Sequence, residues 1–324
     1  MTGEFIRKNA VRVVLLGPQR MAPILDQAFS LLDVEGNVAV ITAGWQEREA
    51  EDQELTNALG RPGINLKLYA RSDEVFRDDP ELFEANRVKQ DFLKQLQELY
   101  RRRLTHAMAA ARQMQRLAHS DSVASGEVVV PHLSRAIAMV RQLDDEHAAQ
   151  VEARIGQFHT EWKPSERPAV ARQRAEIQAI LDQCEAVAIA GGHVVALLNR
   201  MRLFGLQATL AQLPIVAWSA GAMVLTERII LFHDSPPQGR GDAEVLGNGL
   251  GLIPGLVALP NARRRLLLDD RQRIALFARR VAPAHCVALD ERCWLHYTSG
   301  QAWRAGPTTR QLTESGQCVV IEAV

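Results

Sequence analysis

The amino-acid sequence predicts a three-layer α/β/α domain with a mostly parallel sheet and an inserted helical hairpin. Short apolar runs of strand length alternate with helical segments, as in a parallel sheet covered on both faces. Two of these runs end in turns of small residues, around Gly191 and around Ser219. The hairpin is indicated by residues 82–119, which contain no proline or glycine and are rich in helix-forming residues.

The composition argues against several classes of protein. Basic and acidic side chains number 38 each, so the chain has no net charge that would attract it to nucleic acid or to a membrane surface. The four cysteines form no C-x-x-C pair, and no histidine–carboxylate spacing is typical of a metal site. We therefore expect no metal and no cofactor. No apolar run is typical of a signal peptide or a membrane span, which predicts a cytoplasmic location.

The N-terminal part, residues 1–78, opens with a βαβ pattern. Residues 11–17 (VRVVLLG) and 37–44 (NVAVITAG) are predicted strands that flank a helix over residues 21–32, and residues 65–70 are predicted to form a further short strand. We interpret the Gly17-Pro18-Gln19 segment as a plain turn. Residues 45–51 (WQEREAE) could line the rim of a site, but a solvated helix start is the favoured interpretation.

Residues 79–168 are predicted to form the helical insertion. Apolar residues repeat at helical spacing in a first helix (Val88, Phe92, Leu96, Leu99), and a second helix runs through Leu133 and Ile155 after a turn at residues 120–131. The two helices suggest an antiparallel hairpin. Its apolar stripe must be covered, either by a second copy in a homodimer, by closing over a site as a lid, or by packing within the chain.

Residues 169–324 are predicted to continue the α/β domain. Helices are expected over residues 170–181, 196–213 and 268–282, and strands at 214–218 and 229–232, with the loop 234–251 after the latter. The chain is predicted to close with an antiparallel meander of strands within residues 286–297, 302–303 and 318–324.

The turn at Ser219 carries the first functional prediction. A buried strand, residues 214–218, leads into Ser219 and then into the small residues Ala220, Gly221 and Ala222, beyond which a helix can begin. This is the pattern of a nucleophile elbow, in which a tight turn lifts the serine hydroxyl above the sheet edge. The alternative is a serine that only caps a buried helix.

A second turn supports the first. An apolar strand ends at Gly191-Gly192, and His193 follows at the start of a segment that is predicted to form a helix. A glycine pair allows the backbone to approach a ligand closely and to offer N–H groups to an anion. Because the two turns follow consecutive strands of a parallel sheet, both should open at the same carboxyl edge, where such folds place their sites. A tight turn without a ligand is the alternative.

Four segments resemble the peptidase E and cyanophycinase family of serine peptidases: AGGH (190–193), WSAGAMVL (218–225), GLGLIPG (249–255) and VALDERCWLHY (287–297). The family has a class I glutamine amidotransferase-like fold. The resemblance implies that Ser219 is the nucleophile, that the N–H groups of Gly192 and Ala220 form the oxyanion hole, and that Asp234 is the acidic member. The family's histidine position falls on Asn261.

Asparagine cannot act as a general base, because its amide does not titrate. Either His233 or His193 replaces the base, or the site is inactive, and inactivity is the favoured interpretation. The leading hypothesis is a serine-hydrolase scaffold for a small peptide or amide, with Arg263 available to pair with an acidic ligand. The competing hypothesis is a non-catalytic ligand-binding or assembly protein that uses the helical insertion as its interface.

Overall fold

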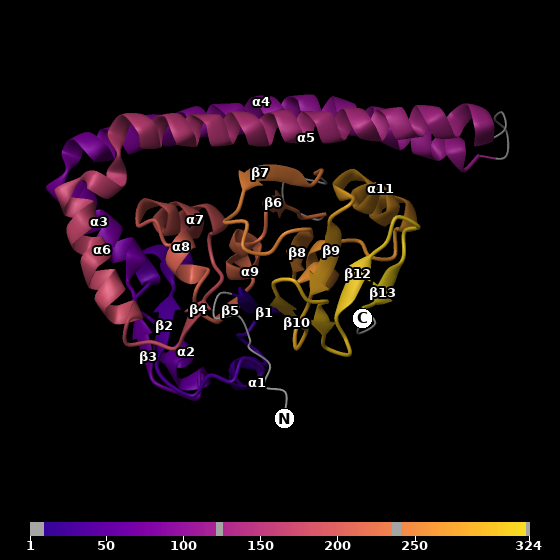
Figure 1. The fold of residues 1–324 in the computed structure, drawn as a ribbon. Coiled ribbons are helices and arrows are strands. Elements are labelled where there is room, and N and C mark those ends of the chain that lie inside the picture. Colours follow the sequence, from indigo (N-terminus) through magenta and orange to yellow (C-terminus); the bar gives the residue numbers. More distant parts are fainter. Residues whose placement is uncertain (1–9, 121–125, 235–240, 322–324) are drawn as a thin grey trace.

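The computed structural model describes residues 10–120, 126–234 and 241–321. Its centre is a seven-stranded sheet of order β11-β10-β1-β5-β4-β2-β3 (Figure 1). The strands β1, β5, β4, β2 and β3 run parallel to one another. β10 is antiparallel to β1, and β11 is antiparallel to β10. The prediction of a mostly parallel sheet is therefore confirmed. The sheet strands are β1 (Arg12–Leu16), β2 (Val38–Ile41), β3 (Gly63–Asn65), β4 (Ala186–Ile189), β5 (Ile215–Trp218), β10 (Trp294–Thr298) and β11 (Arg304–Ala305).

The central strands are apolar throughout because helices cover both faces of the sheet. In β1, Val13 and Leu15 point into one core, whereas Val14 and Leu16 point into the other. The helices α1 (Leu25–Ser30) and α2 (Gln53–Ala58) pack on the second core. The first core receives the helices α3 (Leu68–Asp78), α6 (Pro168–Leu181), α7 (Val194–Leu203), α8 (Gln207–Leu210) and α9 (Ala220–Leu225).

Two smaller sheets complete the molecule. A four-stranded sheet has the order β13-β12-β9-β8, and β6 pairs with β7. The remaining elements are the strands β6 (Arg228–Leu231), β7 (Glu244–Asn248), β8 (Leu256–Pro260), β9 (His285–Leu289), β12 (Arg310–Leu312) and β13 (Cys318–Val320), the helices α10 (Ala262–Arg265) and α11 (Arg271–Val281), and the 3₁₀ helices η1 (Ala43–Arg48) and η2 (Pro164–Glu166).

Several predictions about local structure were wrong. The segment expected to be a loop at residues 234–251 contains the strand β7 (Glu244–Asn248), which pairs with β6. The strand expected at residues 65–70 ends at Asn65, because Lys67 adopts a left-handed conformation (φ 51°) and α3 begins at Leu68. The helix expected at residues 196–213 is divided at Gly205 (φ 62°) into α7 and α8. The closing meander is split between two sheets, because β10 and β11 extend the central sheet whereas β9 pairs in parallel with β8.

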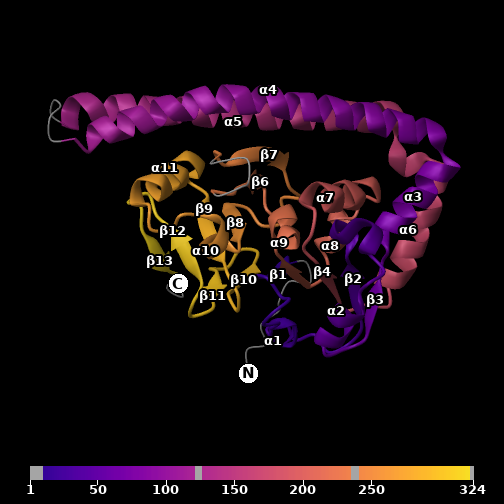
Figure 2. The same ribbon diagram turned by 180° about the vertical axis from the view of Figure 1, so that it is seen from behind.

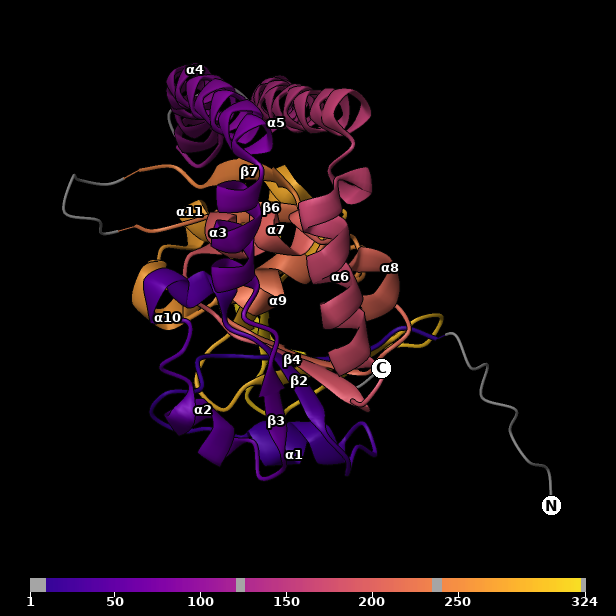
Figure 3. The same cartoon turned by 90° about the vertical axis from the view of Figure 1, so that its left-hand side faces the viewer.

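The helical hairpin consists of α4 (Pro80–Ala118) and α5 (Gly126–Trp162). It lies across β7, α11 and α7, and one end extends beyond α11 (Figures 1 and 2). At the other end, α3 and α6 connect the hairpin to the sheet (Figure 3). Pro131, expected in the turn, lies inside α5. Within the described residues, no helix is long and apolar enough to cross a membrane.

A buried polar network attaches the hairpin to the domain. Arg280 of α11 donates from Nε to Asp144 Oδ2 of α5 (2.7 Å), and Tyr100 Oη of α4 donates to Asp144 Oδ1 (2.8 Å). Tyr100 Oη also accepts from the Val245 N–H of β7 (3.0 Å). Asp144 and Arg280 are 2% and 4% exposed. Part of the hairpin therefore packs within the chain, which was one of the three sequence alternatives.

Candidate active site

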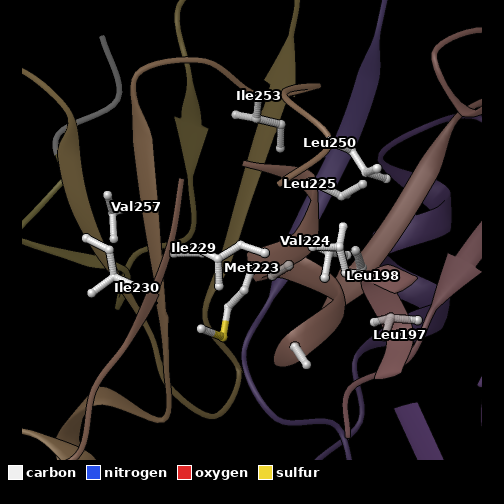
Figure 4. Packing of buried hydrophobic residues seen from close by; sticks show 14 of the residues in the cluster. Leu197, Leu198, Met223, Val224, Leu225, Ile229, Ile230, Leu250, Ile253 and Val257 are labelled. Carbon is white, nitrogen blue, oxygen red and sulfur yellow. The ribbon is translucent and has the colours of Figure 1, made fainter. Parts of the chain in front are cut away.

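Ser219 lies in a strained turn between β5 and α9. Its backbone has φ 53° and ψ −121°, a conformation that costs a residue with a side chain about 1–3 kcal/mol. Gly221 allows this turn to pack on β4, because a Cβ there would lie 2.2 Å from the Ile189 carbonyl oxygen. Buried contacts between α9 and α7, including those around Val224 and Leu198, hold the turn in place (Figure 4).

The Gly191-Gly192 turn lies directly beside Ser219. A Cβ on Gly191 would lie 2.7 Å from the Ser219 Cβ, and a Cβ on Gly192 (φ 111°) would lie 2.3 Å from the Gly44 carbonyl oxygen. In the described part of the chain, no group accepts the N–H of Gly192 or of Ala220. Unsatisfied N–H groups beside a serine hydroxyl are what the stabilisation of an oxyanion requires.

A pocket of about 480 Å³ opens at Ser219 on the carboxyl edge of the parallel strands. Trp45 and Trp218 contribute aromatic surface to it. Its charged residues are Arg20, Arg48, Glu51 and Glu54, and the Arg48 Nε donates to Glu51 Oε2 (2.8 Å). This hydrogen bond lowers the pKa of Glu51. The other lining residues are Pro18, Gln19, Pro23, Leu25, Gly44, Leu55, Ala58, Gly191, Gly192 and Ser219.

None of the described residues that line this pocket is a histidine. His193 is exposed, and its Nδ1 accepts the Ala196 N–H (3.2 Å), which caps α7. That hydrogen bond requires the proton on Nε2, so this tautomer leaves no lone pair for a serine proton. His233 is exposed and lies outside the lining of the pocket. No described side chain hydrogen-bonds to the Ser219 hydroxyl.

Asp234 is buried in a different pocket, between the hairpin and α11. Its Oδ2 accepts the Leu267 N–H (2.8 Å), and its Oδ1 accepts from the Arg273 guanidinium. Asp234 does not line the Ser219 pocket. The carboxylate predicted to orient a catalytic base is therefore paired with an arginine instead.

Asn261 and Arg263 lie after β8, in the four-stranded sheet. Asn261 is left-handed (φ 58°) and donates its N–H to the Leu289 carbonyl oxygen (2.9 Å). The Arg263 N–H donates to Asp290 Oδ1 (3.0 Å), and the Arg263 guanidinium lies 3.7 Å from Asp290 Oδ2. Asp290 in turn packs against Gly17, where a Cβ would lie 1.8 Å from the Asp290 carbonyl oxygen. None of these residues lines the Ser219 pocket.

The charged residues of the pocket were not predicted from the sequence. Residues 45–51 were expected to be a solvated helix start, whereas Trp45, Arg48 and Glu51 line the pocket. The available signal was position, because this segment follows β2, which is parallel to β4 and β5 and ends at the same edge of the sheet. Arg20 gave the same signal, because it lies four residues after the end of β1, which is parallel to β5, whereas Glu54 follows no strand directly.

Comparisons with known proteins identify the class of protein that this fold and turn define. The family model of Peptidase family S51 matches residues 137–304, slightly more than half of the chain, and the protein therefore belongs to that family. The resemblance to peptidase E and cyanophycinase is confirmed. A crystal structure of a peptidase from an acI-B1 Actinobacterium is similar over 97% of this chain and 98% of that chain, with 12% identity and a TM-score of 0.46. No curated protein matches the chain.

Proposed function

We propose that the Ser219 pocket binds a small peptide or amide and that the protein hydrolyses this ligand slowly or not at all. The observation that supports this is the combination of an intact serine turn with a pocket lining that holds no histidine among the described residues. In acyl transfer, the Ser219 hydroxyl would attack the carbonyl carbon while the Gly192 and Ala220 N–H groups stabilise the oxyanion. The described residues that line the pocket include no histidine to accept the hydroxyl proton.

The loss of the base sets the expected rate. Serine proteases that lack one member of the triad retain about 10³–10⁴-fold acceleration over water, from the oxyanion hole and binding alone. We expect activity at or below that level. Asn261, which the family resemblance places at the histidine position, can orient a group but cannot accept the proton.

The charged residues of the pocket suggest the ligand. Arg20 and Glu54 take part in no ion pair with a described residue, so one cation and one anion remain available at the pocket. A dipeptide or an amino-acid amide would match this arrangement, with a carboxylate at Arg20 and an ammonium at Glu54. Arg263 is a weaker candidate for the carboxylate, since it already pairs with Asp290.

A fluorophosphonate probe tests the proposal, because it labels only activated serines. We expect slow or no labelling of the native protein, while calorimetry detects binding of a charged dipeptide that is weakened in Arg20→Ala. The Ser219→Ala variant is the control for the labelled position. Rapid labelling that disappears in Ser219→Ala would show an active hydrolase and refute the proposed loss of activity. Absence of any dipeptide binding would refute the proposed ligand.

The second candidate function is assembly through the hairpin. Val88, Phe92 and Leu99 on α4 are 49%, 44% and 59% exposed, which favours a contact with another chain. A homodimer would cover them, and sedimentation of the protein with and without Leu99→Gln tests it. A cytoplasmic location likewise stays a prediction, which fluorescent tagging in cells would check.

A further inference from the structure

A small cavity lies where the hairpin meets α7. Residues of α4, α5 and α7 line it, and its polar lining consists of Asn86, Lys89, His159, Asn199, Arg200 and Arg202. Its volume is about 20 Å³. A cavity of this size has room for one particle of the size of a water molecule. It is separate from the pocket at Ser219, with which it shares no lining residue.

The charges around this cavity do not balance. Lys89, Arg200 and Arg202 are cationic, and none of the described residues in its lining is acidic. Arg202 forms an ion pair with Glu152 (3.4 Å), whose side chain is 47% exposed and does not line the cavity. The charge of Arg200 interacts with Glu47, Glu49 and Asp73, so Lys89 carries the charge that no described acid offsets. Buried charges in proteins are normally paired, because an isolated buried charge is costly.

Lys89 is the strongest anomaly in this cluster. It is only 7% exposed, and it makes no hydrogen bond or ion pair with a described residue. Its Nζ lies 4.0 Å from the centroid of the Phe158 ring. Burial, followed by the charges of Arg202, Arg154 and Arg200, lowers the pKa of Lys89 to about 8. The Lys89 side chain therefore still mostly carries its charge at pH 7. Its donors have no acceptor among the described residues, although Nζ is not completely closed off from solvent.

The two arginines are held in place by other contacts. Arg202 donates to the Asn248 carbonyl oxygen (2.9 Å), and Arg200 donates to Ser72 Oγ (3.2 Å) and stacks on Tyr69 (4.6 Å to the ring centroid). Their positive charges are thus fixed beside the cavity. The burial of Arg202 lowers its pKa, and burial together with Lys89 and Arg202 lowers the pKa of His159. A preformed cationic cavity of this kind suits an anion.

We propose that this cavity binds one monovalent inorganic anion of the size of chloride, with Lys89 as its principal donor. The volume of about 20 Å³ favours one small anion over sulfate, phosphate or a peptide carboxylate. The anion would join α4 and α5 to α7. Because α7 begins directly after Gly192 and His193, the bound anion would also fix the helix that follows the candidate oxyanion turn. This inference does not depend on catalysis at Ser219.

Thermal unfolding of the full-length protein tests the site. Sodium chloride replaces sodium gluconate at constant ionic strength, so that only the size of the anion changes. We expect the Tm to rise along a saturation curve, by about 2 °C when chloride exceeds its Kd tenfold. Lys89→Met, which keeps an apolar stem of similar length, should abolish the saturable rise. Lys94→Met, on the same helix with a 78% exposed side chain, should retain it.

Bromide soaked into crystals of the native protein provides an independent measurement through its anomalous scattering. A bromide peak in the cavity, next to Lys89, supports the site even where Lys89→Met fails to fold. An empty cavity in saturating bromide overturns the proposal. So does a Tm that responds equally to chloride and gluconate, or a saturable rise that persists in Lys89→Met. None of these measurements uses the activity or labelling of Ser219.

Discussion

The strain at Ser219 leads to a prediction about stability. Replacing Ser219 by glycine removes the Cβ that makes φ 53°, ψ −121° unfavourable, and this should recover about 1–3 kcal/mol. Glycine also increases the conformational entropy of the unfolded chain, which opposes the gain by about 0.5–1 kcal/mol. Ser219→Ala is the matched control, because alanine lacks the hydroxyl but keeps the strained Cβ. We expect Ser219→Gly to be more stable than Ser219→Ala by about 0.5–2 kcal/mol.

Urea unfolding and thermal unfolding of the two variants measure this difference. A chain of 324 residues has an unfolding entropy of about 0.7 kcal/mol/K, so the predicted gain corresponds to about 1–3 °C in Tm. The comparison isolates the backbone, since both variants lack the hydroxyl. If Ser219→Gly is equal to or less stable than Ser219→Ala, the turn stores no strain at this residue, and the argument for a preorganised serine fails.

Three further predictions concern the rest of the chain. Gly221→Ala places a Cβ 2.2 Å from a backbone oxygen and should lower the free energy of unfolding in urea by about 1–3 kcal/mol. Gly156→Ala has open space around its new Cβ and should instead stabilise α5 by about 0.5–1 kcal/mol. Equal effects of the two substitutions would contradict the packing argument. Asp144→Asn leaves the buried guanidinium of Arg280 without its counter-charge and should lower the free energy of unfolding by about 3–5 kcal/mol. Asp145→Asn is the control, because Asp145 forms an exposed ion pair, and it should cost less than about 1 kcal/mol. Burial lowers the pKa of His147 below its ordinary value of 6.5, so the unfolded chain binds its proton first as the pH falls. Stability should therefore decline below about pH 6.5, by at most about 1.4 kcal/mol per pH unit for this histidine, and His147→Gln should reduce that slope; an unchanged slope would remove His147 from the explanation.

The buried network of Tyr100, Asp144 and Arg280 gives the hairpin a fixed position on the domain. Apolar stripes allow helices to slide, whereas a carboxylate that must meet both a guanidinium and a phenol fixes one register. The cavity beside Lys89 lies near the base of the same hairpin, so a bound anion and this network would act at separate points along α4 and α5.

The central fold could be predicted from sequence because its signals are local. Strand-length apolar runs, the small residues at 191–192 and 220–222, and the long helical stretch at 82–119 each determine their own element. The positions of the Ser219 and Gly191 turns at one sheet edge followed from the parallel sheet. The division of the chain at residues 79 and 168 remains a prediction.

The composition of the site depended on contacts that sequence spacing does not encode. Asp234 is only 15 positions from Ser219, yet the tertiary structure pairs it with Arg273 in another pocket. Arg20 and Glu54 are far from Ser219 in the chain but line its pocket. The sequence alone determined the serine turn, because backbone geometry depends on neighbouring residues. The tertiary structure decided which charges surround that turn, because side chains on different elements meet only when the whole chain packs.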